Sequence, residues 1–361
     1  MAVLGNLNFL SFGLLLTGFL PTTLLADPQY DESHALAMMY LSAGAYAVLP
    51  DDCIKRAMPS ANKWVKFLAI NETCDILSNI CSFYTAVSDV RRELVVVFRG
   101  TKDKVQLMVE ALDSIQEGQD FYGVGKVNQY FFDGLKTLWS GVYKVLSEDR
   151  YKDYDVTFTG HSLGGALAAL ASIITVLNGL RTSDQIKLYT FGEPRVGSSS
   201  FAFTLDNLVP HSFRIVNGYD IVPHMPPCSG NVFSQINLPC DPSDSGIGYH
   251  HGTEVWYPDG MAPGAEYKIC KGSPRNEDHS CSAGVKFNWL LYESYIDAHR
   301  HYFDHKIPAF GKLGCAPNMK YEEEILPNDA LTAHDPPKPH STMENLIVKV
   351  KSFGNFLKNI G

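Results

Sequence analysis

Residues 158–165 of the chain read FTGHSLGG, a short stretch that joins an apolar, strand-like run to a long helix-like run. Glycine is costly inside a regular element because it loses more conformational freedom on folding than any other residue. Gly160, Gly164 and Gly165 therefore predict a sharp turn that presents Ser162. A Gly-x-Ser-x-Gly pattern between a strand and a helix is typical of a nucleophile elbow, in which the serine hydroxyl points out above a sheet. We predict that Ser162 is a catalytic nucleophile rather than an incidental serine in a glycine-rich turn.

The sequence around this stretch alternates between predicted strands and predicted helices. Apolar and β-branched runs predict strands over 83–87, 94–99, 155–159, 186–191, 213–216 and 254–257. Apolar residues at helical spacing predict helices over 35–47, 105–115, 128–146 and 163–180. Strands that alternate with helices favour a largely parallel or mixed sheet covered on both faces, so the predicted fold class is α/β.

A serine hydroxyl is a poor nucleophile without a base that accepts its proton. In α/β folds with this elbow, the partners follow in the chain order serine, acid, histidine. Asp220 is the predicted acid because it stands three residues after the end of the strand-like run FRIVN, although a turn-forming aspartate is the alternative. The pattern leaves the histidine open among His211, His224, His250 and His251.

Composition and charge narrow the class of protein. The chain has 361 residues, of which 45% are hydrophobic and 12% aromatic, as expected of a well-packed globular core. The net charge of -9 disfavours nucleic-acid binding, which usually requires a basic excess.

The N-terminus predicts export from the cell. Residues 1–26 contain no charged side chain, and residues 4–25 are rich in Leu and Phe. We interpret residues 1–26 as a cleaved signal peptide, with a membrane anchor as the alternative. The protein is then secreted, extracellular or in the lumen of the secretory pathway, where the sequon Asn71-Glu72-Thr73 would be glycosylated.

The eight cysteines agree with export, because an even number in an exported chain suggests disulfides. The sequence does not fix their connectivity, but spacing favours pairing of neighbours. This gives four candidate pairs: Cys74 with Cys81, Cys228 with Cys240, Cys270 with Cys281, and Cys53 with Cys315. A zinc site is disfavoured since there is no Cys-x-x-Cys pair.

The composition changes after Cys315. Residues 316–361 form a C-terminal extension with a proline-rich linker over 327–339 and an amphipathic stretch over 343–360. Binding of that stretch to a membrane or lipid droplet is one interpretation, and docking on the domain or disorder is the other. A nearby cluster, made of His299, His301 and His305 with Asp297 and Asp304, is interpreted as a solvated helix face rather than a metal site.

Five motifs together resemble class 3 lipases, a family of α/β-hydrolases. They are VVVFRGT (95–101), FTGHSLGGALAAL (158–170), YTFGEPRVGSSSFA (189–202), RIVNGYDIVPHMPP (214–227) and HHGTEVWY (250–257). They occur in the family's order within about residues 31–315, and the extra cysteines resemble a nematode branch of the family. The resemblance implies an α/β-hydrolase domain over 27–315, with a mostly parallel sheet and a helical lid over about 102–116.

The resemblance also implies roles for single residues. The family's catalytic histidine stands four residues before the Glu of a Glu-x-Trp pattern, which here points to His250, with His251 as the alternative. The oxyanion donors would be the backbone amides of Thr101 and Leu163, the second at a helix N-terminus with positive potential.

The activity implied is hydrolysis of acylglycerol esters, as in a triacylglycerol lipase, without metal or organic cofactor. The substrate would be reached at an oil–water or membrane interface, with peripheral contact through the lid and the C-terminal helix. Phospholipase A1 and a general esterase are alternatives on the same scaffold. A non-catalytic lipid carrier is an alternative from another class, which the presence of Ser162, Asp220 and His250 disfavours.

Overall fold

A computed structural model describes residues 28–74, 80–101, 118–228, 239–243, 246, 248–272 and 275–316. The predicted signal peptide, the predicted lid helix and the C-terminal extension beyond Ala316 lie outside these residues. Among the helices that it describes, none is long and apolar enough to cross a membrane.

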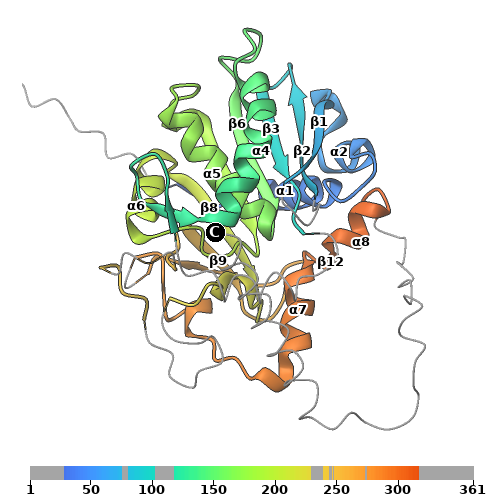
Figure 1. Ribbon diagram of the computed structural model, residues 1–361. Helices are drawn as coiled ribbons and strands as arrows, with labels where there is room; N and C mark the ends of the chain where they lie inside the picture. Colours follow the sequence, from blue (N-terminus) through green and yellow to red (C-terminus); the bar gives the residue numbers. More distant parts are fainter. Residues whose placement is uncertain are drawn as a thin grey trace, which may run out of the picture.

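A central sheet of eight strands organises the described part of the chain, in the order β1-β2-β3-β6-β7-β8-β9-β10 (Figure 1). The strands are β1 (Val65–Thr73), β2 (Ile80–Ser88), β3 (Glu93–Phe98), β6 (Asp155–His161), β7 (Ile186–Phe191), β8 (His211–Asn217), β9 (Thr253–Tyr257) and β10 (Lys268–Cys270). From β3 to β9 the neighbours are parallel, and β1, β2 and β10 add antiparallel strands at the two edges.

Helices cover both faces of this sheet. The helices α4 (Gln129–Leu146) and α5 (Leu163–Leu177) pack on one face, and α1 (Glu32–Gly44) and α8 (Ile307–Lys312) pack on the other (Figure 1). Successive residues of β3 serve the two cores, because Val96 packs with α4 and α5 whereas Val95 and Val97 pack with α1. This is why the run Leu94–Phe98 is apolar without alternation, as expected of a buried parallel strand.

Shorter elements complete the described fold. They are the helices α2 (Asp51–Ala57), α6 (Ser199–Leu208) and α7 (Tyr292–Arg300), the strand pairs β4 (Gly118–Asp120) with β5 (Lys126–Asn128) and β11 (His301–Tyr302) with β12 (His305–Lys306), and the 3-10 turns η1 (Ser60–Asn62), η2 (Ser183–Gln185), η3 (Val222–His224), η4 (Ser282–Gly284) and η5 (Trp289–Leu291).

The predicted α/β architecture is confirmed, with differences at the ends of elements. The helix predicted over 163–180 ends at Leu177, because Gly179 adopts a positive φ of 65°. The edge strands β1 and β10 were not predicted, since an edge strand has no continuous apolar run to mark it.

Four disulfides join the eight cysteines in the pairs that spacing favours. They are Cys53–Cys315, Cys74–Cys81, Cys228–Cys240 and Cys270–Cys281. The first spans 262 residues and ties α2 to the turn after α8, so it closes nearly the whole domain into one loop.

Removing the long disulfide is expected to destabilise the domain by about 3–5 kcal/mol, because a disulfide restricts the unfolded chain more when its loop is longer. The variant is Cys53→Ser/Cys315→Ser, measured by urea unfolding of the secreted protein. The matched control is Cys74→Ser/Cys81→Ser, whose loop spans only 7 residues. Equal losses in the two variants would contradict the loop-length argument.

Candidate active site

Ser162 occupies a strained turn between β6 and α5. Its φ of 61° and ψ of -130° lie in a region that residues other than glycine rarely adopt, at a cost of about 1–3 kcal/mol. The turn is held by the Ser162 N–H, which donates to the Phe191 carbonyl at 2.8 Å, and by the Gly165 N–H, which donates to the Ser162 carbonyl at 2.8 Å. The predicted elbow geometry is thus present.

Close backbone contacts explain two glycines of the elbow. A Cβ on Gly160 would collide with the Gly164 carbonyl, and a Cβ on Gly164 would collide with the Phe98 carbonyl at the end of β3. The third glycine lets α5 lie against the segment after β7, since a Cβ on Gly165 would stand 3.1 Å from the Glu193 Cβ. The sequence motif is therefore a steric requirement of this turn.

Asp220 follows β8 and is completely buried. Its carboxylate accepts a hydrogen bond from the Val222 N–H at 2.9 Å and another from the Tyr302 hydroxyl at 2.6 Å. Both of its oxygens stand 3.0 Å from Nδ1 of His299. The Asp220 carboxylate therefore contacts an imidazole, and that imidazole belongs to His299.

His299 lies near the end of α7 and is also completely buried. Its Nδ1 faces Asp220, while its Nε2 has no hydrogen-bond partner among the described residues. The His299 ring stacks on the ring of His161 with centroids 4.6 Å apart, and His161 immediately precedes Ser162. The fold therefore brings an aspartate–histidine pair, whose Nε2 has no partner in the described part of the chain, against the residue that precedes the strained serine.

His161 holds the backbone that carries this histidine. Its Nε2–H donates to the His299 carbonyl at 2.8 Å, and its Nδ1 accepts from the Tyr46 hydroxyl at 2.9 Å. Burial, followed by the proximity of His299, lowers the pKa of His161 to about 3. His161 is thus neutral at neutral pH, so it adds no positive charge beside the His299 ring.

The prediction that His250 partners Asp220 is wrong. The His250 Nε2–H donates to the Pro223 carbonyl at 2.6 Å, and the backbone N–H of His250 donates to Glu277 at 2.9 Å. The alternative, His251, is engaged elsewhere, with Nε2 at 2.9 Å from Glu193 and Nδ1 at 3.3 Å from the Ser212 hydroxyl. Both rings are buried in structural contacts.

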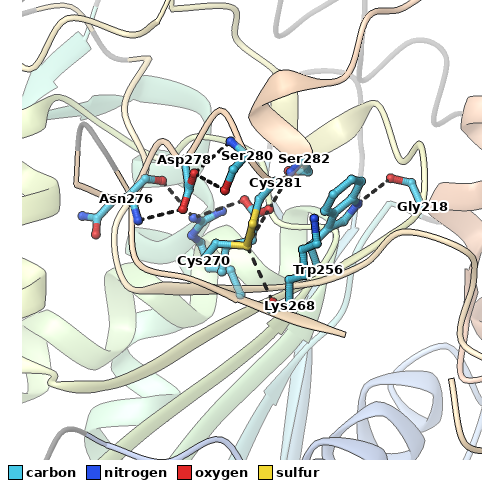
Figure 2. Close-up of a disulfide and its surroundings, with 12 residues drawn as sticks. Gly218, Trp256, Lys268, Cys270, Asn276, Asp278, Ser280, Cys281 and Ser282 are labelled. Carbon is cyan, nitrogen blue, oxygen red and sulfur yellow. Dashed lines mark hydrogen bonds and ion pairs between the residues drawn. A yellow bond between two sulfur atoms is a disulfide. The ribbon is translucent and has the colours of Figure 1, made fainter. Parts of the chain in front are cut away.

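A disulfide-closed loop accounts for the burial of His250. The Cys270–Cys281 bond, shown in Figure 2, brackets this loop, whose Glu277 forms a buried two-pronged ion pair with Arg195 at 2.8 and 2.9 Å. Asn276 from the same loop donates to the His250 carbonyl at 3.1 Å. The segment 250–257 is thereby fixed as a structural part of the sheet.

The interpretation of His299 as part of a solvated helix face is also wrong. Tyr295, Ile296 and His299 form the buried side of α7, a spacing of three and four residues that could have signalled an inward-facing histidine. The other two histidines of the cluster do not join it. His301 bonds to Asp297, and His305 stacks on Phe310 with ring centroids 3.8 Å apart.

The predicted oxyanion donors belong to the two chain segments that meet at the elbow. Leu163 is the first residue of α5, so its amide lies at the positive end of the helix dipole. Thr101 follows the end of β3, whose Phe98 pairs with Gly160 of β6. A Cβ on the intervening Gly100 would stand 3.2 Å from the Ser162 Cβ, which shows how closely the two chain segments approach.

One group of side chains has the composition of a metal site. Glu254, Cys270 and Cys281 have donor atoms within 4.8 Å of one another. The two sulfurs are joined in the disulfide of Figure 2, so they are not thiolate ligands.

The sheet order and the elbow define an α/β-hydrolase, and three comparisons agree. Residues 95–230 match the family model of the class 3 lipases. The chain is 43% identical over 302 residues to Lipase ZK262.3 of Caenorhabditis elegans. The aligned region covers 82% of this chain and 86% of that protein. The chain therefore belongs to the class 3 lipase family and is a carboxylic ester hydrolase.

Solved structures extend this likeness to the fold. A lipase from Rhizopus microsporus var. chinensis superimposes with a TM-score of 0.59 at 25% identity, over 79% of this chain and 94% of that chain. A triacylglycerol lipase, described as having a serine protease triad at its catalytic centre, superimposes with a TM-score of 0.55 at 25% identity, over 76% of this chain and 93% of that chain. The fold and family inferred from the five motifs are thus confirmed.

Proposed function

We propose that the protein is a secreted lipase that hydrolyses acylglycerol esters with Ser162 as nucleophile, His299 as base and Asp220 as the acid. The observation that carries the proposal is the Asp220–His299 pair. The His299 Nδ1 lies 3.0 Å from both carboxylate oxygens, its Nε2 has no partner among the described residues, and its ring stacks on His161, the residue before the strained serine. In this proposal His299 has the role that the Glu-x-Trp pattern assigned to His250.

In the proposed mechanism, His299 Nε2 accepts the proton of the Ser162 hydroxyl as its oxygen attacks the ester carbonyl carbon. Asp220 stabilises the resulting imidazolium, and the amides of Leu163 and Thr101 stabilise the oxyanion. The protonated His299 then donates its proton to the leaving alcohol. Water, activated in turn by His299, releases the fatty acid from Ser162.

The acylglycerol substrate is supported by the family and by the relative described as a triacylglycerol lipase. Access at an oil–water interface through a lid over 102–116, and peripheral membrane contact through the C-terminal helix over 343–360, belong to the same proposal. Secretion and glycosylation at Asn71 are supported by the four disulfides and by the exposed position of Asn71 on the edge strand β1.

The test compares the secreted wild type with Ser162→Ala on a triacylglycerol emulsion, a diacylglycerol, phosphatidylcholine and a soluble short-chain ester. We expect the emulsion to be hydrolysed by the wild type and the Ser162→Ala rate to fall about 10⁴-fold or more. Preferred hydrolysis of phosphatidylcholine would instead identify a phospholipase A1, and of the soluble ester a general esterase. Failure of a labelled fluorophosphonate to modify Ser162 in folded protein would favour a lipid carrier.

A further inference from the structure

Two adjacent leucines project into solvent at the start of the helix that carries His299. Leu290 is 80% exposed and Leu291 is 51% exposed, and both belong to the turn η5 that leads into α7. Tyr219, the neighbour of Asp220, is 56% exposed and packs on Tyr295 of α7 with ring centroids 6.5 Å apart. We call Leu290, Leu291 and Tyr219 the leucine patch.

Hydrogen bonds join the turn that carries the leucines to its own base. The side-chain oxygen of Asn288 accepts from the Leu290 N–H at 3.0 Å, and its carbonyl accepts from the Leu291 N–H at 2.8 Å. The Asn288 N–H itself donates to the Tyr295 hydroxyl at 2.9 Å. Phe287 is buried against Tyr295 with ring centroids 4.9 Å apart, so the leucines are held outward by a packed base.

The position of the patch ties it to the catalytic end of the domain. The chain runs from Leu291 along α7 to His299, and Tyr219 immediately precedes Asp220. In Figure 1, α7 extends from the sheet side toward the periphery of the domain. The leucine patch therefore belongs to the same two chain segments, α7 with its preceding turn and the turn after β8, that carry His299 and Asp220.

We infer that the leucine patch inserts into the surface of the neutral lipid on which the enzyme acts. This inference rests on the proposed function. The flanking exposed charges, Lys286 and Glu293, are opposite in sign, so the patch carries no net charge and suits an uncharged acylglycerol surface. Exposed leucines gain free energy when they leave water for an acyl phase, and the hydrogen-bonded turn already presents both side chains outward.

The test measures partition onto a trioleoylglycerol emulsion stabilised with phosphatidylcholine, by flotation of the full secreted chain. All variants carry Ser162→Ala, so that binding is measured without turnover. We expect Leu290→Ser/Leu291→Ser to lower the partition coefficient by at least about tenfold. The matched control is Val90→Ser/Leu177→Ser, which removes two exposed apolar side chains (57% and 41%). Val90 lies in the turn before β3 and Leu177 is the last residue of α5, at the other end of that helix from Ser162. The control is expected to partition within about twofold of its parent.

Three outcomes would overturn the inference. They are unchanged partition of the leucine variant, an equal loss in the control, and a dimeric wild type that the leucine substitutions convert to a monomer in sedimentation. Hydrolysis by the same variants with Ser162 restored separates the two proposals. A wild type that hydrolyses none of the esters while partition still depends on the leucines refutes the proposed function alone. Normal hydrolysis with unchanged partition refutes the leucine patch alone.

Discussion

Replacing His299 by glutamine is expected to lower kcat for ester hydrolysis by about 10⁴-fold or more, because the only base facing Asp220 among the described residues is removed. Glutamine retains a similar length, so packing against the His161 ring is largely kept. The measurement is kcat on a soluble short-chain ester, normalised to the folded fraction by thermal unfolding. Labelling of Ser162 by a fluorophosphonate should slow in parallel, since the same base activates the serine.

His250→Gln is the matched control for this experiment. Its Nε2–H bonds only a backbone carbonyl, that of Pro223, and its ring is buried in a structural contact. We expect His250→Gln to lose stability by about 1–3 kcal/mol but to keep kcat per folded molecule within about tenfold. A large loss of kcat in His250→Gln with little loss in His299→Gln would refute the assignment of His299 and identify His250 as the base.

The folded protein is expected to lose about 3–4 kcal/mol of stability between pH 8 and about pH 5.5. Three buried histidines have lowered pKa values, chiefly because burial penalises their charged form: His161, His224 and His250. The pKa of His161 falls to about 3, and the pKa values of the other two fall well below their usual range.

The direction of the effect follows from proton binding. In the unfolded chain these histidines take up protons near their ordinary pKa of about 6.5, whereas the folded protein keeps them neutral. Their contribution to stability is therefore complete above about pH 6.5 and is lost as the pH falls, by about 1 kcal/mol per histidine at pH 5.5. Glu254 acts in the opposite direction, because burial raises the pKa of its carboxyl, and so offsets part of this loss.

Urea unfolding at a series of pH values measures this loss. His224→Gln is the informative variant, because the His224 Nε2 has no hydrogen-bond partner in the described part of the chain and its ring rests against Phe287. The variant should flatten the dependence of unfolding free energy on pH by about one third between pH 8 and 5.5. A slope identical to that of the wild type would show that His224 is not held neutral in the folded protein.

The short motif around Ser162 was enough to predict the elbow turn and the elements on both sides of it from sequence alone. Gly160 and Gly164 are steric requirements of one turn, and the apolar runs on either side specify the strand and helix that the turn joins. The position of Asp220 could also be predicted, because a residue just past the end of a parallel strand lies at the same edge of the sheet as the elbow. The pairing of neighbouring cysteines could also be predicted, since a short loop keeps its two cysteines close in space.

The histidine was decided only by the tertiary structure. His250 and His299 both follow Asp220 in the chain, and sequence order does not say which imidazole reaches the carboxylate. The Cys270–Cys281 loop buries His250 against Glu277 and Pro223, whereas α7 turns the apolar side of Tyr295 and Ile296 inward and carries His299 with it. Local patterns specify which face of an element is buried, but the contact between two such elements depends on how the intervening chain is packed.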